Sequence, residues 1–326
     1  MSIEILTLTP TQPNRDILER GHLLTEQINP HSQNLDQMTS LELVELFNHE
    51  DTQAIAAIAT ARNELAEAID QTAAALRQGG RLFYVGAGTS GRLGVLDAAE
   101  CPPTFCTAPE LVQGIIAGGA GALVRSSEDL EDRPEDGAAA IAQRQVTDLD
   151  VVVGISAGGT TPFVHGALHT ARERGATTVF IACVPTDQVN APVDVDIRLL
   201  VGPEILAGST RLKAGTATKL ALNILSTGVM VRLGKVYGNR MVDVSVTNRK
   251  LHDRALRILR DLTQLSREEA VLLLEKSGRQ VKLALLMHWI GCDRAQGTQL
   301  LEQHQGNLRE AIVNLSPQSQ AWSSDD

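Results

Sequence analysis

The sequence predicts an α/β fold: a five-stranded parallel sheet sandwiched by helices, with N-terminal helices before it and a small all-α domain after it. Apolar runs alternate with helical stretches, and they lie at 82–85, 111–117, 151–155, 178–184 and 195–201. Continuous apolar strands separated by helices are typical of a parallel sheet that is covered on both faces. Past Asn239 no strand pattern follows and charges become dense, which indicates a separate helical unit.

The helices before the sheet are predicted from their end signals. Residues 1–38 are polar and contain several prolines, so we expect an extended arm there. The run from Thr39 to Glu42 has the capping-box pattern that opens a helix, and a second helix is expected over 52–76. The sheet domain with these helices is predicted to span 39–238, and its last long helix 213–233.

The C-terminal part, 239–315, is predicted to be all-helical, with helices at 248–262, 266–276, 280–290, 293–303 and 307–315. Within it, 291–312 resembles a ubiquitin-associated-like three-helix module. The alternative interpretation is a compact helical cap on the sheet domain, because short helical modules are generic. The tail, 316–326, is expected to be disordered.

Composition and charge restrict the classes of partner. The net charge of −10 argues against nucleic acid or an anionic membrane as the main partner. No apolar run approaches the roughly 20 residues that a membrane span needs, and no signal-peptide pattern opens the chain. The four cysteines form no C-x-x-C pair and are typical of scattered reduced thiols. We therefore expect a cytoplasmic protein.

A glycine-rich loop follows the first predicted strand, at 86–91 (G-A-G-T-S-G), and opens a helix. Its glycines formally match the dinucleotide-binding pattern, but the acidic residue that such sites place after the second strand is missing. Thr89 and Ser90 add two hydroxyls that dinucleotide loops do not need. Backbone N–H groups at a helix N-terminus, together with hydroxyls, suit a terminal phosphomonoester.

A second loop of the same kind follows the third predicted strand, at 156–162 (S-A-G-G-T-T-P), with Pro162 in the first turn of the next helix. In a doubly wound sheet, such loops gather at the carboxyl ends of the strands. The alternative, that both are ordinary tight turns, accounts less well for two hydroxyl-bearing loops. We therefore predict one phosphate site, with the candidate residues Gly88, Thr89, Ser90, Ser156, Gly159, Thr160 and Thr161.

Four stretches together resemble the N-acetylmuramic acid 6-phosphate etherase family. They are G-A-G-T-S-G-R-L-G-V-L-D-A-A-E-C-P-P-T at 86–104, A-G-G-A-G-A-L at 117–123, G-S-T-R-L-K-A-G-T-A-T-K at 208–219, and the N-P and L-D dipeptides within 29–36. The resemblance covers about 28–312 and implies the sugar isomerase fold and a homodimer with active sites near the interface. It also implies conversion of N-acetylmuramate 6-phosphate and water into N-acetylglucosamine 6-phosphate and D-lactate, in amino-sugar catabolism or peptidoglycan recycling.

The implied reaction is an elimination followed by an addition of water. Opening of the sugar ring frees an aldehyde at C1 that acidifies the C2 proton, so lactate can leave from C3. These steps need a base and an acid but no metal and no cofactor, and two carboxylates can share them. The resemblance assigns Glu100 as the proton donor, and its apolar neighbours would favour the protonated form by desolvation. It places Glu131 as the second carboxylate and candidate base, with Glu128 and Asp132 as alternatives.

The second loop departs from the family pattern. Gly158 stands where relatives have Ser, and Ser156 stands where many have Ala. We hypothesise that Ser156 supplies the missing hydroxyl contact. Lys213 is a further candidate for the phosphate, with Arg211 and Lys219, although a position on the helix surface suits these cations equally.

His165 and His169 have the i, i+4 spacing of a metal-binding pair, but no third ligand accompanies them, so we interpret them as ordinary helix residues. Two rival functions share the predicted phosphate loops. One is an aldose–ketose isomerase, and the other is a non-catalytic sugar-phosphate sensor that resembles glucokinase regulatory protein. The presence of one sheet domain argues against the sensor.

Overall fold

The computed structural model describes residues 20–125 and 128–313. Its centre is a parallel sheet in the strand order β2-β1-β3-β4-β5. The strands are β1 (Leu82–Gly86), β2 (Val112–Ile116), β3 (Val151–Ile155), β4 (Thr177–Ala182) and β5 (Val195–Arg198). The predicted α/β class and its five strands are confirmed, because strands buried on both faces read as continuous apolar runs.

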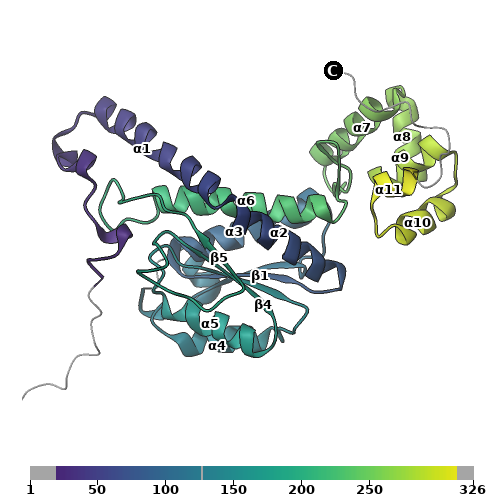
Figure 1. Ribbon diagram of the computed structural model, residues 1–326. Coiled ribbons are helices and arrows are strands. Elements are labelled where there is room, and N and C mark those ends of the chain that lie inside the picture. Colours follow the sequence, from purple (N-terminus) through teal and green to yellow (C-terminus); the bar gives the residue numbers. More distant parts are fainter. Residues whose placement is uncertain (1–19, 126–127, 314–326) are drawn as a thin grey trace, which may run out of the picture.

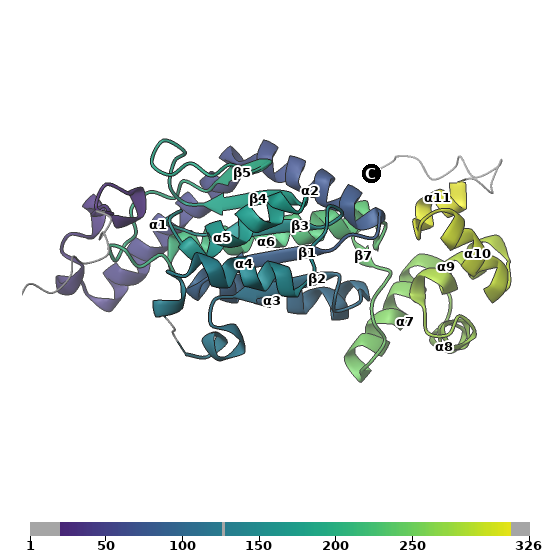
Figure 2. The ribbon, with the colours of Figure 1, turned by 90° about the horizontal axis from the view of Figure 1, so that it is seen from below.

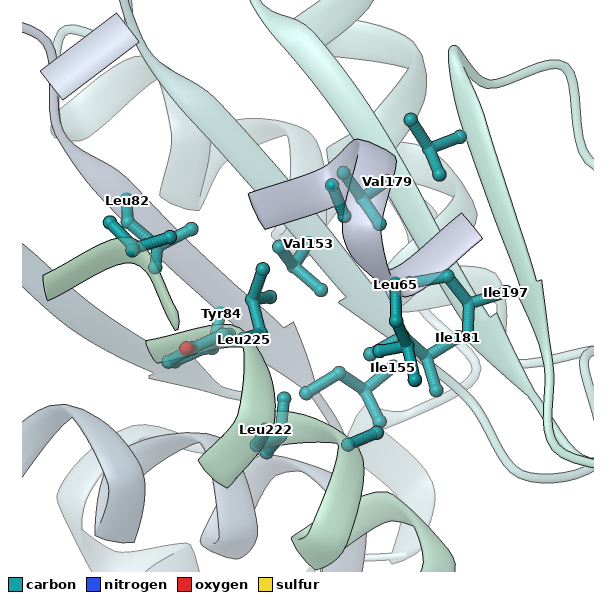
Figure 3. Packing of buried hydrophobic residues seen from close by; sticks show 14 of the residues in the cluster. Leu65, Leu82, Tyr84, Val153, Ile155, Val179, Ile181, Ile197, Leu222 and Leu225 are labelled. Atoms are coloured by element: carbon teal, nitrogen blue, oxygen red, sulfur yellow. The ribbon is translucent and has the colours of Figure 1, made fainter. Parts of the chain in front are cut away.

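Helices cover both faces of the sheet (Figure 1). One face carries α1 (Ser40–Thr60), α2 (Arg62–Arg77), α3 (Gly88–Phe105) and α6 (Lys213–Arg232). The other face carries α4 (Pro134–Gln143) and α5 (Pro162–Glu173). Because successive strand residues point to opposite faces, Tyr84 packs with the first group of helices and Phe83 with the second. Figure 3 shows Leu65 of α2 and Leu222 of α6 meeting the first of these strand faces.

The first two helices divide at a different place from the one predicted. The predicted capping box does open α1, since Thr39 and Glu42 bond each other's backbone N–H groups. However, α1 continues to Thr60, whereas a second helix was expected from residue 52. No glycine or proline stands near that position, and the buried Ala54 and Ala57 keep the helix against the core.

The part of the predicted extended arm that the structure describes, residues 20–38, is folded. It contains the 3-10 helices η1 (Leu24–Glu26), η2 (Pro30–Ser32) and η3 (Leu35–Gln37). We call it the N-terminal segment. Its Leu23 belongs to the core on the α4/α5 face, and Thr25 and Asn29 are buried. The prolines exclude a long helix here, but they do not prevent packing. Residues 1–19 and the predicted disordered tail lie outside the described residues.

The helices after residue 239 form a unit with its own core. They are α7 (Arg249–Thr263), α8 (Arg267–Lys276), α9 (Val281–Ile290), α10 (Arg294–Gln303) and α11 (Leu308–Val313). A small hairpin of β6 (Val236–Tyr237) and β7 (Arg240–Met241), which the sequence did not indicate, precedes them. Figure 2 places this unit at the end of the sheet domain opposite to the N-terminal segment. No helix of the described residues is long and apolar enough to cross a membrane.

Candidate functional site

The two glycine-rich loops leave neighbouring strands at the point where the strand order reverses. In the register, Gly86 at the end of β1 lies beside Ile155 at the end of β3. The chain then passes to β2 on one side and to β4 on the other. Parallel sheets bind ligands in the crevice outside the carboxyl ends of the strands at such a switch point. The first loop (86–91) and the second loop (156–162) therefore lie side by side in the position where a phosphate is expected.

The first loop turns sharply into α3. Gly88 has φ +51°, a left-handed conformation that glycine adopts without strain. A Cβ atom at Gly91 would lie 2.6 Å from Cγ1 of Ile116 and 2.7 Å from the carbonyl oxygen of Gly86, so the loop packs directly on the strands. Thr89 and Ser90 follow Gly88 in the first turn and are half-buried. The Thr89 methyl group lies 3.6 Å from the Cβ position of Gly215, which brings the first turn of α6 to this loop.

The second loop is held by its own hydrogen bonds. Ser156 is buried, and its Oγ lies 2.9 Å from Oγ1 of Thr161 and accepts the Thr161 N–H at 3.3 Å. Gly159 has φ +78°, and its N–H donates to the Ser156 carbonyl. The Gly159 carbonyl lies 2.6 Å from Nε2 of His165. Thr160, between these residues, is half-buried. The structure thus brings the predicted loop residues together and gives His165 a contact that helix periodicity did not suggest.

The two candidate carboxylates lie in different surroundings. Glu100 is exposed on the last turns of α3, so the desolvation expected from its apolar neighbours is absent within one chain. Ten residues of helix separate it from Ser90, a rise of about 15 Å. Glu131 is half-buried between η5 (Glu128–Leu130) and α4, and its carbonyl accepts the Phe163 N–H at 2.9 Å. That bond ties Glu131 to the helix that the second loop opens.

Of the two alternatives to Glu131 as the candidate base, the structure describes the side chain of Asp132 alone. Asp132 is exposed and pairs with Arg20 at 4.0 Å. The side chain of Glu128 lies outside the described part. Between β2 and these residues, η4 (Gly119–Leu123) is linked to α3 by a hydrogen bond from Nε of Arg92 to the Leu123 carbonyl. The chain between β2 and α4, which carries Glu131, is therefore hydrogen-bonded to α3 through Arg92 and to α5 through Phe163.

Lys213, predicted as a phosphate ligand, is 1% exposed, and its Nζ lies 2.6 Å from Oε2 of Glu50 on α1. The same carboxylate accepts from Asn29 at 2.7 Å and lies 2.7 Å from Nδ1 of His31. Burial alone would raise the pKa of Glu50, but the hydrogen bonds of Lys213, His31 and Asn29 hold it at about 2. The carboxylate of Glu50 on α1 therefore links the N-terminal segment, through Asn29 and His31, to α6, through Lys213.

The first turn of α6 has a second carboxylate partner. Glu204 is fully buried, and its two oxygens accept the N–H groups of Lys213 and Ala214, each at 2.9 Å. Burial raises the pKa of Glu204 against the effect of these donors. Neither Glu50 nor Glu204 could be found from the sequence, because no spacing relates them to Lys213. Arg211 and Lys219, the other cations of that stretch, are exposed.

Among the described residues, one cluster of metal-ligating side chains comes together, and its carboxylate already pairs with Lys213. Donor atoms of His31, His49 and Glu50 lie within 4.8 Å of one another. However, a carboxylate paired with a buried ammonium group has little charge left for a cation. His169 approaches Glu173 at 3.8 Å on the exposed face of α5 and, unlike His165, does not contact the loop in any described hydrogen bond.

Comparison with known proteins gives the class of the fold. The family model described as the N-terminal SIS domain of glucokinase regulatory protein matches residues 64–172, and that of the C-terminal lid domain of the same protein matches 238–282. With the sheet order and the two loops described above, these matches define a sugar isomerase (SIS) domain followed by a helical C-terminal region.

Relatives along the whole chain give the family. The N-acetylmuramic acid 6-phosphate etherase of Trichormus variabilis is 76% identical over 93% of this chain and 99% of its own length. That of Rippkaea orientalis is 77% identical over 90% of this chain and 96% of its own. A solved phosphoheptose isomerase from Francisella tularensis is 18% identical, with a TM-score of 0.47 over 60% of this chain and 100% of its own. The chain belongs to the N-acetylmuramic acid 6-phosphate etherase family.

Proposed function

We propose that this protein is a carbon–oxygen lyase that cleaves the D-lactyl ether of N-acetylmuramic acid 6-phosphate, giving N-acetylglucosamine 6-phosphate and D-lactate. The observation that carries the proposal is the identity of 76% with a named etherase over 99% of that protein's length. The activity belongs to amino-sugar metabolism and peptidoglycan recycling, and we propose that it takes place in the cytoplasm.

The two loops would hold the phosphate of the substrate. Two helices, α3 and α5, begin at these loops, and unpaired N–H groups at a helix N-terminus favour an anion. The residues that we propose for this role are Gly88, Thr89, Ser90, Ser156, Gly159, Thr160 and Thr161. Lys213 remains a candidate phosphate ligand, but its ammonium group has to break its ion pair with Glu50 before it can bind the phosphate.

The proposed chemistry divides between two carboxylates. In the open-chain sugar, Glu131 takes the C2 proton, the C3–O bond breaks, and Glu100 gives a proton to the departing lactate oxygen. Water then adds to C3 and C2 regains a proton, so the sugar keeps a hydroxyl where the ether was. General acid–base groups in such roles contribute roughly 10²–10⁴-fold each.

Release of D-lactate from N-acetylmuramic acid 6-phosphate tests the proposal directly. Glu100→Gln is expected to lower that release by at least roughly 100-fold, while exchange of the C2 proton with deuterated solvent continues. The matched control is Glu110→Gln, an exposed glutamate after α3, which should retain full activity. Full activity of Glu100→Gln would exclude the two-carboxylate scheme, and an isomerised sugar without lactate would indicate the aldose–ketose isomerase instead.

We further propose a homodimer whose interface covers the face of α3 that bears Glu100. Leu96 is 50% exposed and lies one turn before Glu100, on the same side of the helix. Leu41 and Val44 of α1 and Val231 of α6 are further exposed apolar side chains on this layer of helices. A second chain on this face would bury them and desolvate the carboxylate.

Light scattering after size-exclusion chromatography measures the association. Leu96→Glu should convert the dimer into a folded monomer, because it buries a charge in the proposed interface. Leu272→Glu, at a residue of α8 that is 61% exposed, is the matched control and should stay dimeric. A wild-type monomer, or a dimer that Leu96→Glu leaves intact, would contradict this arrangement.

A further inference from the structure

A threonine of the N-terminal segment lies over the second loop. Thr25 is 0% exposed, and its Oγ1 lies 3.6 Å from the position that a Cβ atom would take at Gly158. Among the described residues not adjoining Gly158 in the chain, no other heavy atom lies within 4 Å of that position. A methyl group at Gly158 would therefore be in ordinary contact with the buried Thr25 hydroxyl, which is directed at this position of the loop.

This hydroxyl has no hydrogen-bond partner among the described residues. A buried hydroxyl without a partner costs free energy of about 1–3 kcal/mol, and native proteins leave few of them unpaired. An oxygen atom of a ligand held over the loop would remove this cost. Phosphate oxygens are strong acceptors. The loop below carries three hydroxyls, those of Ser156 and Thr161, which contact each other, and that of Thr160.

The hydroxyl is fixed in position by its neighbours in the chain. The Leu24 N–H donates to Oε1 of Gln188 at 2.9 Å, and Nε2 of Gln188 donates to the His22 carbonyl at 3.1 Å. On one side of Thr25, Leu23 belongs to the core with Phe163 at the start of α5. On the other side, Asn29 donates to the Pro203 carbonyl and to Glu50. Groups held this way before a ligand arrives lose little entropy on binding.

We propose that the Thr25 hydroxyl is a further substrate-binding group, which donates a hydrogen bond to the phosphate of the sugar held over Gly158. The inference rests on the proposed function for the identity of the sugar and for the phosphate role of the two loops. It makes the N-terminal segment part of the site, and it supplies a hydroxyl above the loop position where this chain has glycine.

Thr25→Val removes the hydroxyl and keeps the shape, and Thr25→Ser keeps the hydroxyl. Binding of inorganic phosphate to the full chain, measured by titration calorimetry, should weaken at least roughly tenfold in Thr25→Val, because a hydrogen bond to a charged group is lost. The KM for N-acetylmuramic acid 6-phosphate, measured by lactate release, should rise by a similar factor. Thr25→Ser should stay within roughly threefold of the wild type in both.

The chain offers a matched control. Thr72 of α2 is also fully buried, and its Oγ1 also lacks a hydrogen-bond partner among the described residues. Thr72→Val should leave phosphate binding and KM unchanged. If Thr25→Val does not fold, which its melting curve reveals, Thr25→Ala replaces it in the same titration. Wild-type phosphate affinity in a folded variant without the hydroxyl would overturn the proposal. Failure of the wild type to release lactate would refute the proposed function, while the phosphate titration would still test Thr25.

Discussion

Replacement of Lys213 by methionine should destabilise the protein strongly. The ammonium group is 1% exposed and pairs with Glu50 at 2.6 Å, and Glu50 is itself buried. Removal of one partner of a buried ion pair leaves the other charge without compensation, which costs about 3–5 kcal/mol. For a domain of this size that corresponds to a fall in Tm of roughly 10 °C. A second change, Glu50→Gln, should recover most of the loss, because it removes the stranded charge.

The pH dependence of the effect follows from the pKa of Glu50. Burial raises this pKa, but the hydrogen bonds of Lys213, His31 and Asn29 outweigh burial and lower it from 4.5 to about 2. A carboxyl whose pKa is lowered in the folded state stabilises that state above its unfolded pKa, and the stabilisation is lost as the pH falls through the folded pKa. The difference corresponds to about 3 kcal/mol. The gap in Tm between the wild type and Lys213→Met should therefore narrow from pH 5 to pH 2.

Thermal melts followed by circular dichroism measure both effects, and the KM for lactate release is measured beside them. Arg257→Met is the control, because its pair with Asp253 is exposed and contributes at most about 1 kcal/mol. If Lys213→Met keeps the wild-type Tm and raises only the KM, the ion pair does not stabilise the fold and Lys213 acts on the phosphate. That result would refute the reasoning.

Three other predictions concern the loops and the thiols. Ser156→Ala removes a hydroxyl that contacts Thr161 and, by our hypothesis, the phosphate. The loss of this hydrogen bond should weaken substrate binding by about 1 kcal/mol or more, which raises the KM several-fold. An unchanged KM would contradict the hypothesis. Gly91→Ala should lower stability by about 1–3 kcal/mol, because its Cβ would meet Ile116 and the Gly86 carbonyl, and urea unfolding measures the loss. Burial raises the pKa of Cys183 to about 12, whereas Cys106 is exposed. Ellman's reagent should therefore react with Cys106 in a first, fast phase, and Cys106→Ser should abolish this fast phase. A fast phase that persists in Cys106→Ser would place the accessible thiol elsewhere.

Periodic patterns in the sequence predicted the regular elements well. Strands such as β3 are apolar along their whole length, and the helices of the C-terminal region repeat their apolar residues at helical spacing. The capping box at Thr39 predicted where α1 begins. Patterns did not predict where α1 ends, because no glycine or proline marks Thr60.

By itself, the sequence determined the fold class, the two loops and the family, because each of these depends on residues that are close together in the chain. The tertiary structure alone decided which distant groups meet. The bond between Lys213 and Glu50 joins residues 163 positions apart, and Thr25 contacts Gly158 although 133 positions separate them in the chain. No local pattern encodes such pairs, since burial and the need to satisfy a buried charge or hydroxyl act only after the chain has folded.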